Sequence, residues 1–205
     1  MKKKINRTIL YSEGEMLIKK LLDLIDNSSE EIAIRWKDEI KRSEYTKNYA
    51  ALNDEELVRK SRNVYQNLRT WLDKDISNLE IGQAYVFIGK ERYKEKYPLC
   101  EVTYALHLTK KVLWDYLMSK GIMTNALEIY QAMELIIRVY NFFDMAVFYL
   151  IRGYHEELYK NMVGNIKDKQ TLKSVFPEGS FFYEMEPEYK QFEKFIKGFN
   201  LFKTR

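Results

Sequence analysis

The chain has 205 residues, of which 46% are hydrophobic and 31% charged, and its formal net charge is +4. This composition excludes a disordered chain, and the 8 Gly and 3 Pro are too few for a collagen-like repeat and disfavour a β-sandwich or β-barrel. No run of about 18 apolar residues occurs, so we expect no transmembrane segment. The single cysteine, Cys100, cannot form an internal disulfide, which favours a cytoplasmic location.

The basic residues are concentrated at the two ends of the chain. Lys2, Lys3, Lys4 and Arg7 lie at the start, and lysines recur in 188–205, whereas the stretch between is slightly acidic. A nucleic-acid-binding core needs a basic face, so we expect no nucleic-acid partner.

Apolar periodicity and capping signals predict helices in succession along the first 163 residues. Helices are expected to begin near Ser12, Ser28 and Asn53, because each of these residues is followed by Glu three positions later. A fourth helix is expected over 79–96. A fifth runs from Pro98 to a C-cap at Gly121, since proline suits the first turn and glycine suits the end.

Two glycines lie seven residues apart on the fourth predicted helix. Gly82 and Gly89 therefore share nearly one helical face. Because glycine carries no Cβ, another backbone is expected to approach closely at this face.

A sixth helix is predicted from Thr124 to about Val163, and its stretch 135–151 is apolar almost all round. That pattern is typical of a central buried helix. The length leaves open whether it is one helix or two. We expect an all-α domain over 1–163, followed over 164–205 by a linker and an amphipathic tail helix with phenylalanines on one face and lysines on the other.

The sixth predicted helix also carries polar residues spaced by three: Arg138, Asn141 and Asp144. A buried charge needs a partner, so Arg138 and Asp144 would pair with another helix, for example with Arg92 or Glu91. This arrangement favours a buried polar network that sets helix register. A polar floor of a ligand pocket and a stripe that faces solvent are the alternatives.

The sequence contains none of the phosphate-loop, dinucleotide, zinc-protease, Cys-x-x-Cys or nucleophile-elbow motifs, so we expect no enzyme and no metal site. Cys100 is interpreted as a small core thiol. His107 lies among apolar residues and is interpreted as a core or pocket residue. Its alternative role is axial ligand of a haem, which makes His107 the candidate cofactor-binding residue.

Several short segments resemble the N-terminal sensor domain of the RsbR and RsbRD family, which are co-antagonists in the stressosome, a bacterial stress-signalling assembly. Trp36, in an Ile-x-x-x-Trp helix, adds to this resemblance over roughly residues 12–160. The segments are Ile88–Tyr93, Tyr97–Leu99, Val112–Asp115, Phe142–Tyr149 and Arg152–Tyr154.

The resemblance implies a cytoplasmic, all-α, non-haem globin-like bundle that is often a homodimer and passes a signal to an output module. It carries over no catalytic residues, and Gly89, Arg92, Asp144 and the segment 152–154 are interpreted as structural. The chain departs from the family pattern because only about 40 residues follow the last long helix, and these show no α/β output domain.

The resulting hypothesis is a non-enzymatic signalling domain that changes conformation when it binds an unknown small ligand or a protein partner. One alternative is a globin-like protein that binds haem or another apolar ligand. The other is a peripheral membrane adaptor, because the tail pattern, with Phe192, Phe195, Ile196 and Phe199 opposite lysines, is typical of an interfacial helix.

Overall fold

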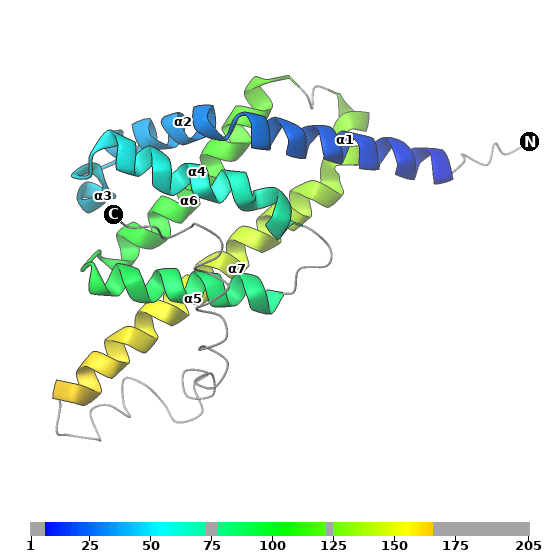
Figure 1. Cartoon of the computed structure of the whole chain (residues 1–205). Helices are drawn as coiled ribbons and strands as arrows, with labels where there is room; N and C mark the ends of the chain where they lie inside the picture. Colours follow the sequence, from blue (N-terminus) through cyan, green and yellow to red (C-terminus); the bar gives the residue numbers. More distant parts are fainter. Residues whose placement is uncertain (1–6, 73–77, 122–124, 166–205) are drawn as a thin grey trace, which may run out of the picture. The chain divides into compact units, whose positions relative to one another are not determined.

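The computed structural model describes residues 7–72, 78–121 and 125–165, and every regular element in these ranges is an α-helix (Figure 1). The predicted all-α fold is therefore confirmed. The predicted tail helix and nearly all of the predicted linker lie outside the described residues, as do Lys2, Lys3 and Lys4. The helices are α1 (Arg7–Asn27), α2 (Ser29–Arg42), α3 (Lys47–Ala50), α4 (Asp54–Trp71), α5 (Asn78–Lys94), α6 (Leu99–Ser119) and α7 (Ala126–Asn165).

The chain divides into two compact units, each built from two separate segments. Unit 1 combines Met1–Asp75 with Tyr104–Phe143, and unit 2 combines Ile76–Thr103 with Asp144–Arg205. Helices α6 and α7 thus contribute residues to both units.

Local capping chemistry explains where α4 and α7 begin. The side chain of Asn53 accepts a hydrogen bond from the backbone N–H of Glu56 at 2.7 Å, as predicted for the start of α4. Asn125 performs the same role for α7, accepting from the N–H of Glu128 at 2.9 Å. Gly121, with φ 64°, follows α6 as the predicted C-terminal glycine.

The predicted start of the first helix is wrong. Helix α1 begins at Arg7, so Ser12 lies inside the helix rather than at its N-cap. Helix α2 begins at Ser29, next to the predicted position, but the side chain of Ser28 makes no capping hydrogen bond. The backbone of Ser28 instead donates to Leu24 and accepts from Ile32, both at 3.0 Å, so α1 and α2 follow one another almost without interruption.

Unit 1 has a core in which aromatic side chains of α2 and α4 bond to the backbone of α6. The indole N–H of Trp36 donates to the carbonyl of Ala105 at 3.1 Å, and the hydroxyl of Tyr65 donates to the carbonyl of Thr109 at 3.1 Å. Both aromatic side chains are buried. The polar atoms of both side chains are satisfied inside the core, so neither Trp36 nor Tyr65 leaves a buried donor without a partner.

Unit 2 is built on a close crossing of α5 with the second part of α7. A Cβ on Gly89 would overlap the carbonyl oxygen of Leu150, and a Cβ on Gly153 would overlap the carbonyl oxygen of Val86. At Gly82 an added Cβ would meet the ring of Tyr149 instead. The prediction that another backbone approaches the glycine face of this helix is confirmed at Gly89.

The interpretation of α7 as a helix buried on all sides is wrong. Residues 126–165 form one continuous helix, but its apolar residues occupy two faces. In unit 1, Ala132, Leu135, Val139 and Phe142 are buried, whereas Tyr130 and Ile137 are exposed. Apolar residues on every side of a helix therefore do not show that every side is buried.

Among the described residues, no helix combines the length and apolar character needed to cross a bilayer.

Candidate functional site

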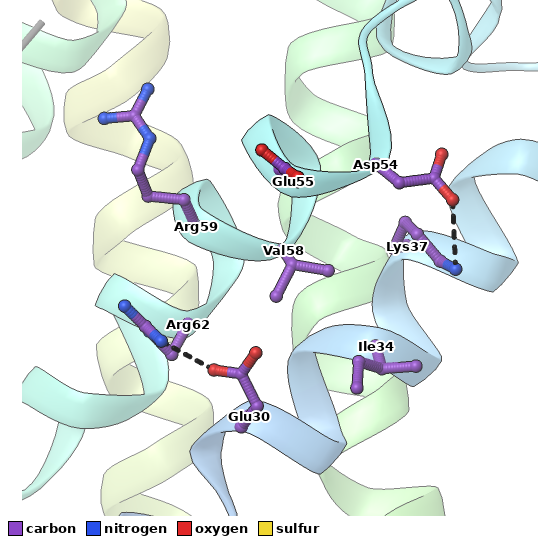
Figure 2. Close-up of a pocket in the computed structure, with 8 residues that line it drawn as sticks. All are labelled: Glu30, Ile34, Lys37, Asp54, Glu55, Val58, Arg59 and Arg62. Carbon is purple, nitrogen blue, oxygen red and sulfur yellow. Dashed lines mark hydrogen bonds and ion pairs between the residues drawn. The ribbon is translucent and has the colours of Figure 1, made fainter. Parts of the chain in front are cut away.

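A surface groove of about 370 Å³ lies in unit 1 between α2 and α4 (Figure 2). Ile34 and Val58 supply apolar surface to its lining. Helical spacing explains the lining, because positions three or four apart on each helix face the same side. The residues that line the groove are Glu30, Ile34, Lys37, Asp54, Glu55, Val58, Arg59 and Arg62.

Ion pairs join α2 to α4 at two places in the groove (Figure 2). In one pair, Arg62 Nη1 lies 2.7 Å from Glu30 Oε2. In the other, Lys37 Nζ lies 3.4 Å from Asp54 Oδ2. The groove thus offers apolar surface together with both signs of charge, which suits a ligand that carries an apolar part and one or two charged groups.

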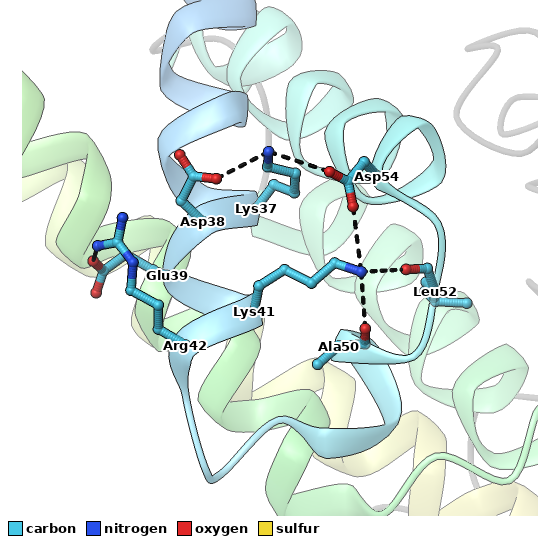
Figure 3. A network of polar contacts seen from close by, with 8 residues as sticks. All are labelled: Lys37, Asp38, Glu39, Lys41, Arg42, Ala50, Leu52 and Asp54. Carbon is cyan, nitrogen blue, oxygen red and sulfur yellow. Dashed lines mark hydrogen bonds and ion pairs between the residues drawn. The ribbon is translucent and has the colours of Figure 1, made fainter.

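A polar network extends from the second ion pair into the loop before α4 (Figure 3). Lys41 donates to the carbonyls of Ala50 and Leu52 at 2.9 and 2.7 Å, and its Nζ lies 3.3 Å from Asp54 Oδ1. These contacts tie α2 to the end of α3 and the start of α4. Lys41 thereby connects Asp54, a residue that lines the groove, with the backbone carbonyls that precede α4.

The network shifts the pKa of Asp54 and the pKa of Lys37 in the directions that favour their charged forms. The hydrogen bond from Lys41 is the main cause that lowers the pKa of the Asp54 carboxyl, and Lys37 adds to it. The hydrogen bond to Asp38 is the main cause that raises the pKa of Lys37, and Asp54 adds to it. Both groups therefore remain charged at neutral pH.

The structure places His107 and Cys100 at the surface. His107 is exposed on α6 between the buried side chains of Leu106 and Leu108, so its interpretation as a core or pocket residue is wrong. This exposed position gives the haem hypothesis no support. Cys100 is exposed near the start of α6, so its interpretation as a core thiol is wrong as well.

The polar residues predicted on α7 do not form one buried network. Asn141 and Asp144 are exposed, which fits the solvent-facing alternative. Arg138 is half-buried, forms an ion pair with Glu134 one turn earlier at 2.5 Å, and donates to the carbonyl of Leu72 at 3.5 Å. The network was predicted there because the helix is apolar all round, and that pattern does not show which face turns inward.

Arg92 lies in unit 2, and its guanidinium pairs with Glu95 on the same helix and lies 5.7 Å from the ring centre of Tyr97. The side chain is largely buried. Arg92 lies in the last turn of α5. Lys96, which follows this helix, adopts a left-handed conformation with a φ of 62°.

A buried charge cluster that the sequence did not reveal joins α5 to α7 within unit 2. Glu156 Oε2 lies 2.7 Å from Lys90 Nζ, and Glu156 Oε1 accepts from Arg152 Nε at 3.1 Å. All three side chains are at most 11% exposed. The i, i+4 spacing of Arg152 and Glu156 was visible in the sequence, but their burial and the third partner were not.

In unit 2, a second contact joins α7 to the loop before α6. The hydroxyl of Tyr154 donates to the carbonyl of Tyr97 at 2.9 Å, and its ring packs edge-on against Tyr93 with centroids 5.2 Å apart. Most of the residues that match the resemblance pattern, Gly89, Arg152, Gly153 and Tyr154 among them, therefore make the helix contacts of this unit. Their interpretation as structural residues agrees with these contacts.

Within the described ranges, no three His, Cys, Asp or Glu side chains gather closely enough to hold a metal ion.

The family model described as "Histidine kinase N terminal" matches residues 18–156. The matched stretch spans α2 to α6 entirely, together with the last part of α1 and most of α7, which makes this chain an all-α signalling sensor domain. The chain belongs to the histidine kinase N-terminal family. The searches of curated proteins and of solved structures found no match.

Proposed function

We propose that this chain is a non-enzymatic bacterial sensor domain that changes conformation when a small ligand or a partner protein binds. The family match over residues 18–156 is the observation that carries this proposal, because it covers α2 to α6, the last part of α1 and most of α7. The lack of any common catalytic motif in the sequence is consistent with it.

We infer that the groove between α2 and α4 receives the signal. Its volume falls within the range of roughly 300–1,000 Å³ that small-molecule sites occupy. The Glu30–Arg62 and Lys37–Asp54 pairs supply both signs of charge around Ile34 and Val58. A ligand with an apolar body and charged groups, such as a zwitterion or a peptide segment, matches this lining.

The response would be a shift between two populated conformations, which requires a ligand that binds one of them better. Helix α7 is the proposed carrier, because this single helix of 40 residues contributes side chains to both units. The RsbR-like role in a stress response and the globin-like relationship are finer parts of the same proposal. The segments 88–93 and 152–154, on which the resemblance rests, support them.

The proposal is tested by native mass spectrometry of freshly purified protein, followed by hydrogen exchange with and without the species that is found. We expect a mass above that of the apo chain, and slower exchange in α2 and α4 when the species is bound. Val58→Trp fills the groove and should abolish both effects, whereas Val163→Trp on an exposed position of α7 should leave them intact. A bound species that changes exchange nowhere would count against a sensor.

A further inference from the structure

The groove between α2 and α4 carries opposite charges at its two ends (Figure 2). Helix α4 places the carboxylates of Asp54 and Glu55 at one end, and the guanidinium groups of Arg59 and Arg62 at the other. At the second end, Glu30 of α2 is the carboxylate that lines the groove, and it pairs with Arg62. The lining of this end therefore holds more cations than carboxylates.

At the acidic end, the exposed carboxylate of Glu55 is available to a ligand. The two lysines of this region are already paired: Lys37 Nζ lies 2.9 Å from Asp38 Oδ1. Likewise, Lys41 Nζ lies 3.3 Å from Asp54 Oδ1. Glu55 is exposed and forms no ion pair with any residue that the structure describes. A cationic group that enters here finds a carboxylate that it can pair with.

At the basic end, the guanidinium of Arg62 has donor capacity that the protein does not use. Its Nη1 donates to Glu30 Oε2 at 2.7 Å, whereas its Nε is buried and donates to no group of the described chain. A guanidinium offers several coplanar N–H donors that match the geometry of a carboxylate. The side chain of Arg62 is 41% exposed, so an anionic group in the groove can reach it. Arg59, three residues earlier, adds a second positive charge.

The separation of the two ends determines how long a ligand must be to reach both. Glu55 and Arg62 are seven residues apart on α4, which corresponds to about 10 Å along the helix axis. Three residues of an extended peptide also span about 10 Å, whereas a free amino acid carries both of its charges within one residue. Between the ends, Val58 and Ile34, which is 43% exposed, offer an apolar contact.

We propose that the groove binds a free tripeptide with an apolar middle residue. The N-terminal ammonium pairs with Glu55, the C-terminal carboxylate binds Arg62, and the middle side chain lies on Val58. Both termini are charged at neutral pH, because the pKa of an α-amino group is about 8 and that of an α-carboxyl about 3.5. This inference rests on the sensor function proposed above and names the class of ligand that the sensor binds.

The test is a nuclear magnetic resonance titration of the full chain with alanyl-leucyl-alanine and two capped forms of this peptide. We expect the free tripeptide to shift resonances of α2 and α4 around the groove. Acetylation of its N-terminus and amidation of its C-terminus should each weaken binding about 5-fold or more, because each removes one terminal charge. Free leucine should bind more weakly than the free tripeptide, since it cannot reach both ends.

The variant Glu55→Gln identifies the ammonium site. It should weaken binding of the free tripeptide by about the same factor as acetylation, and it should cause no further loss with the acetylated peptide. Glu44→Gln is the matched control, since it makes the same change at an exposed carboxyl outside the groove, and it should leave binding unchanged. Val58→Trp fills the groove and should abolish binding of the free tripeptide.

Two results would overturn the proposal. One is an equal affinity for the free and the capped peptides, and the other is a free tripeptide that shifts no resonance of α2 or α4 at millimolar concentration. Either result leaves the sensor function intact if native mass spectrometry finds another bound species that Val58→Trp removes. The sensor function itself fails when a bound species changes hydrogen exchange nowhere, so the two failures are distinguishable.

Discussion

Trp36 contributes both a buried ring and a hydrogen bond to the core of unit 1. The ring is 4% exposed and its N–H donates to the carbonyl of Ala105. Trp36→Phe removes both the donor and part of the packing, so we expect a loss of about 1–3 kcal/mol in the free energy of unfolding. Urea unfolding followed by circular dichroism measures it.

Trp114 provides the control for this substitution. Its indole N–H is buried and has no hydrogen-bond partner in the part of the chain that the structure describes. Trp114→Phe therefore removes no hydrogen bond, and we expect it to be the milder of the two changes. Equal losses for the two variants would show that the bond of Trp36 contributes nothing.

The protonation of Glu31 should affect how the free energy of unfolding depends on pH. The hydroxyl of Tyr116 donates to its carboxylate at 2.8 Å, and this bond is the main cause that lowers its pKa, with Lys120 and Arg35 adding to it. A carboxyl with a lowered folded-state pKa stabilises the fold above its unfolded value of 4.5, and this contribution is lost as the pH falls through the folded value.

We therefore expect Glu31→Gln to flatten the decline of stability below pH 4.5. Thermal unfolding of wild type and variant across this range measures the difference. Glu55→Gln, the same substitution at an exposed carboxyl of α4, is a suitable control. The same slope in wild type and Glu31→Gln would contradict the expectation.

At the scale of elements, the α5–α7 crossing predicts a graded series of substitutions. Gly89→Ala and Gly153→Ala push a methyl group into backbone carbonyls that cannot move without separating the helices. We expect each to cost at least about 3 kcal/mol. Gly82→Ala meets only the side chain of Tyr149, nearest atom 2.5 Å, which can rotate, so its cost should be smaller. Denaturant midpoints of the three variants rank them, and Gly82→Ala as the most damaging would contradict this order.

The backbone conformation at the end of α5 predicts that one substitution stabilises the folded protein. Lys96 is the residue in left-handed conformation there, and the N–H of Tyr97 closes the helix by donating to Arg92 O at 3.0 Å. Glycine adopts this conformation without the Cβ penalty, so Lys96→Gly should raise the free energy of unfolding by up to about 1 kcal/mol. Lys94→Gly, inside the last turn, should lower it instead. Thermal unfolding of the two variants measures both signs.

The helix boundaries show how much of the structure can be predicted from the local sequence. The start of α4 was predictable because the side chain of Asn53 reaches the N–H of Glu56, and both groups lie within one turn. The pair Ser12 and Glu15 carries the same pattern, but α1 runs through it from Arg7. A capping residue favours a helix start without forbidding a helix that continues across it, so the pattern alone does not decide between the two.

The candidate groove was not predictable, although its residues are ordinary members of α2 and α4. The sequence shows that Glu30, Ile34 and Lys37 share one face of α2. It does not show that this face lies beside Val58 and Arg62 of α4, since that depends on how two helices pack. The pairs Glu30–Arg62 and Lys37–Asp54 are products of this packing.

For the whole molecule, the division into units has a consequence for fragments. Unit 1 takes its second segment from 104–143, and the polar atoms of Trp36 and Tyr65 bond to this segment. A fragment of residues 1–103 lacks these partners, so we expect it to show no cooperative unfolding by circular dichroism. The fragment 1–165 keeps every described residue and should unfold cooperatively. Cooperative unfolding of 1–103 would show that unit 1 does not need its second segment.

The sequence by itself determined the helical class, most of the helix positions and the close approach at Gly89, because periodicity, caps and a missing Cβ are local properties. Only the tertiary structure decided which sides of α6 and α7 are buried. It decided that His107 on α6 and Asn141 on α7 are exposed and that Glu156 is buried between two cations. An apolar helix has the same pattern on every side. The helices that pack against it determine which residues leave the water.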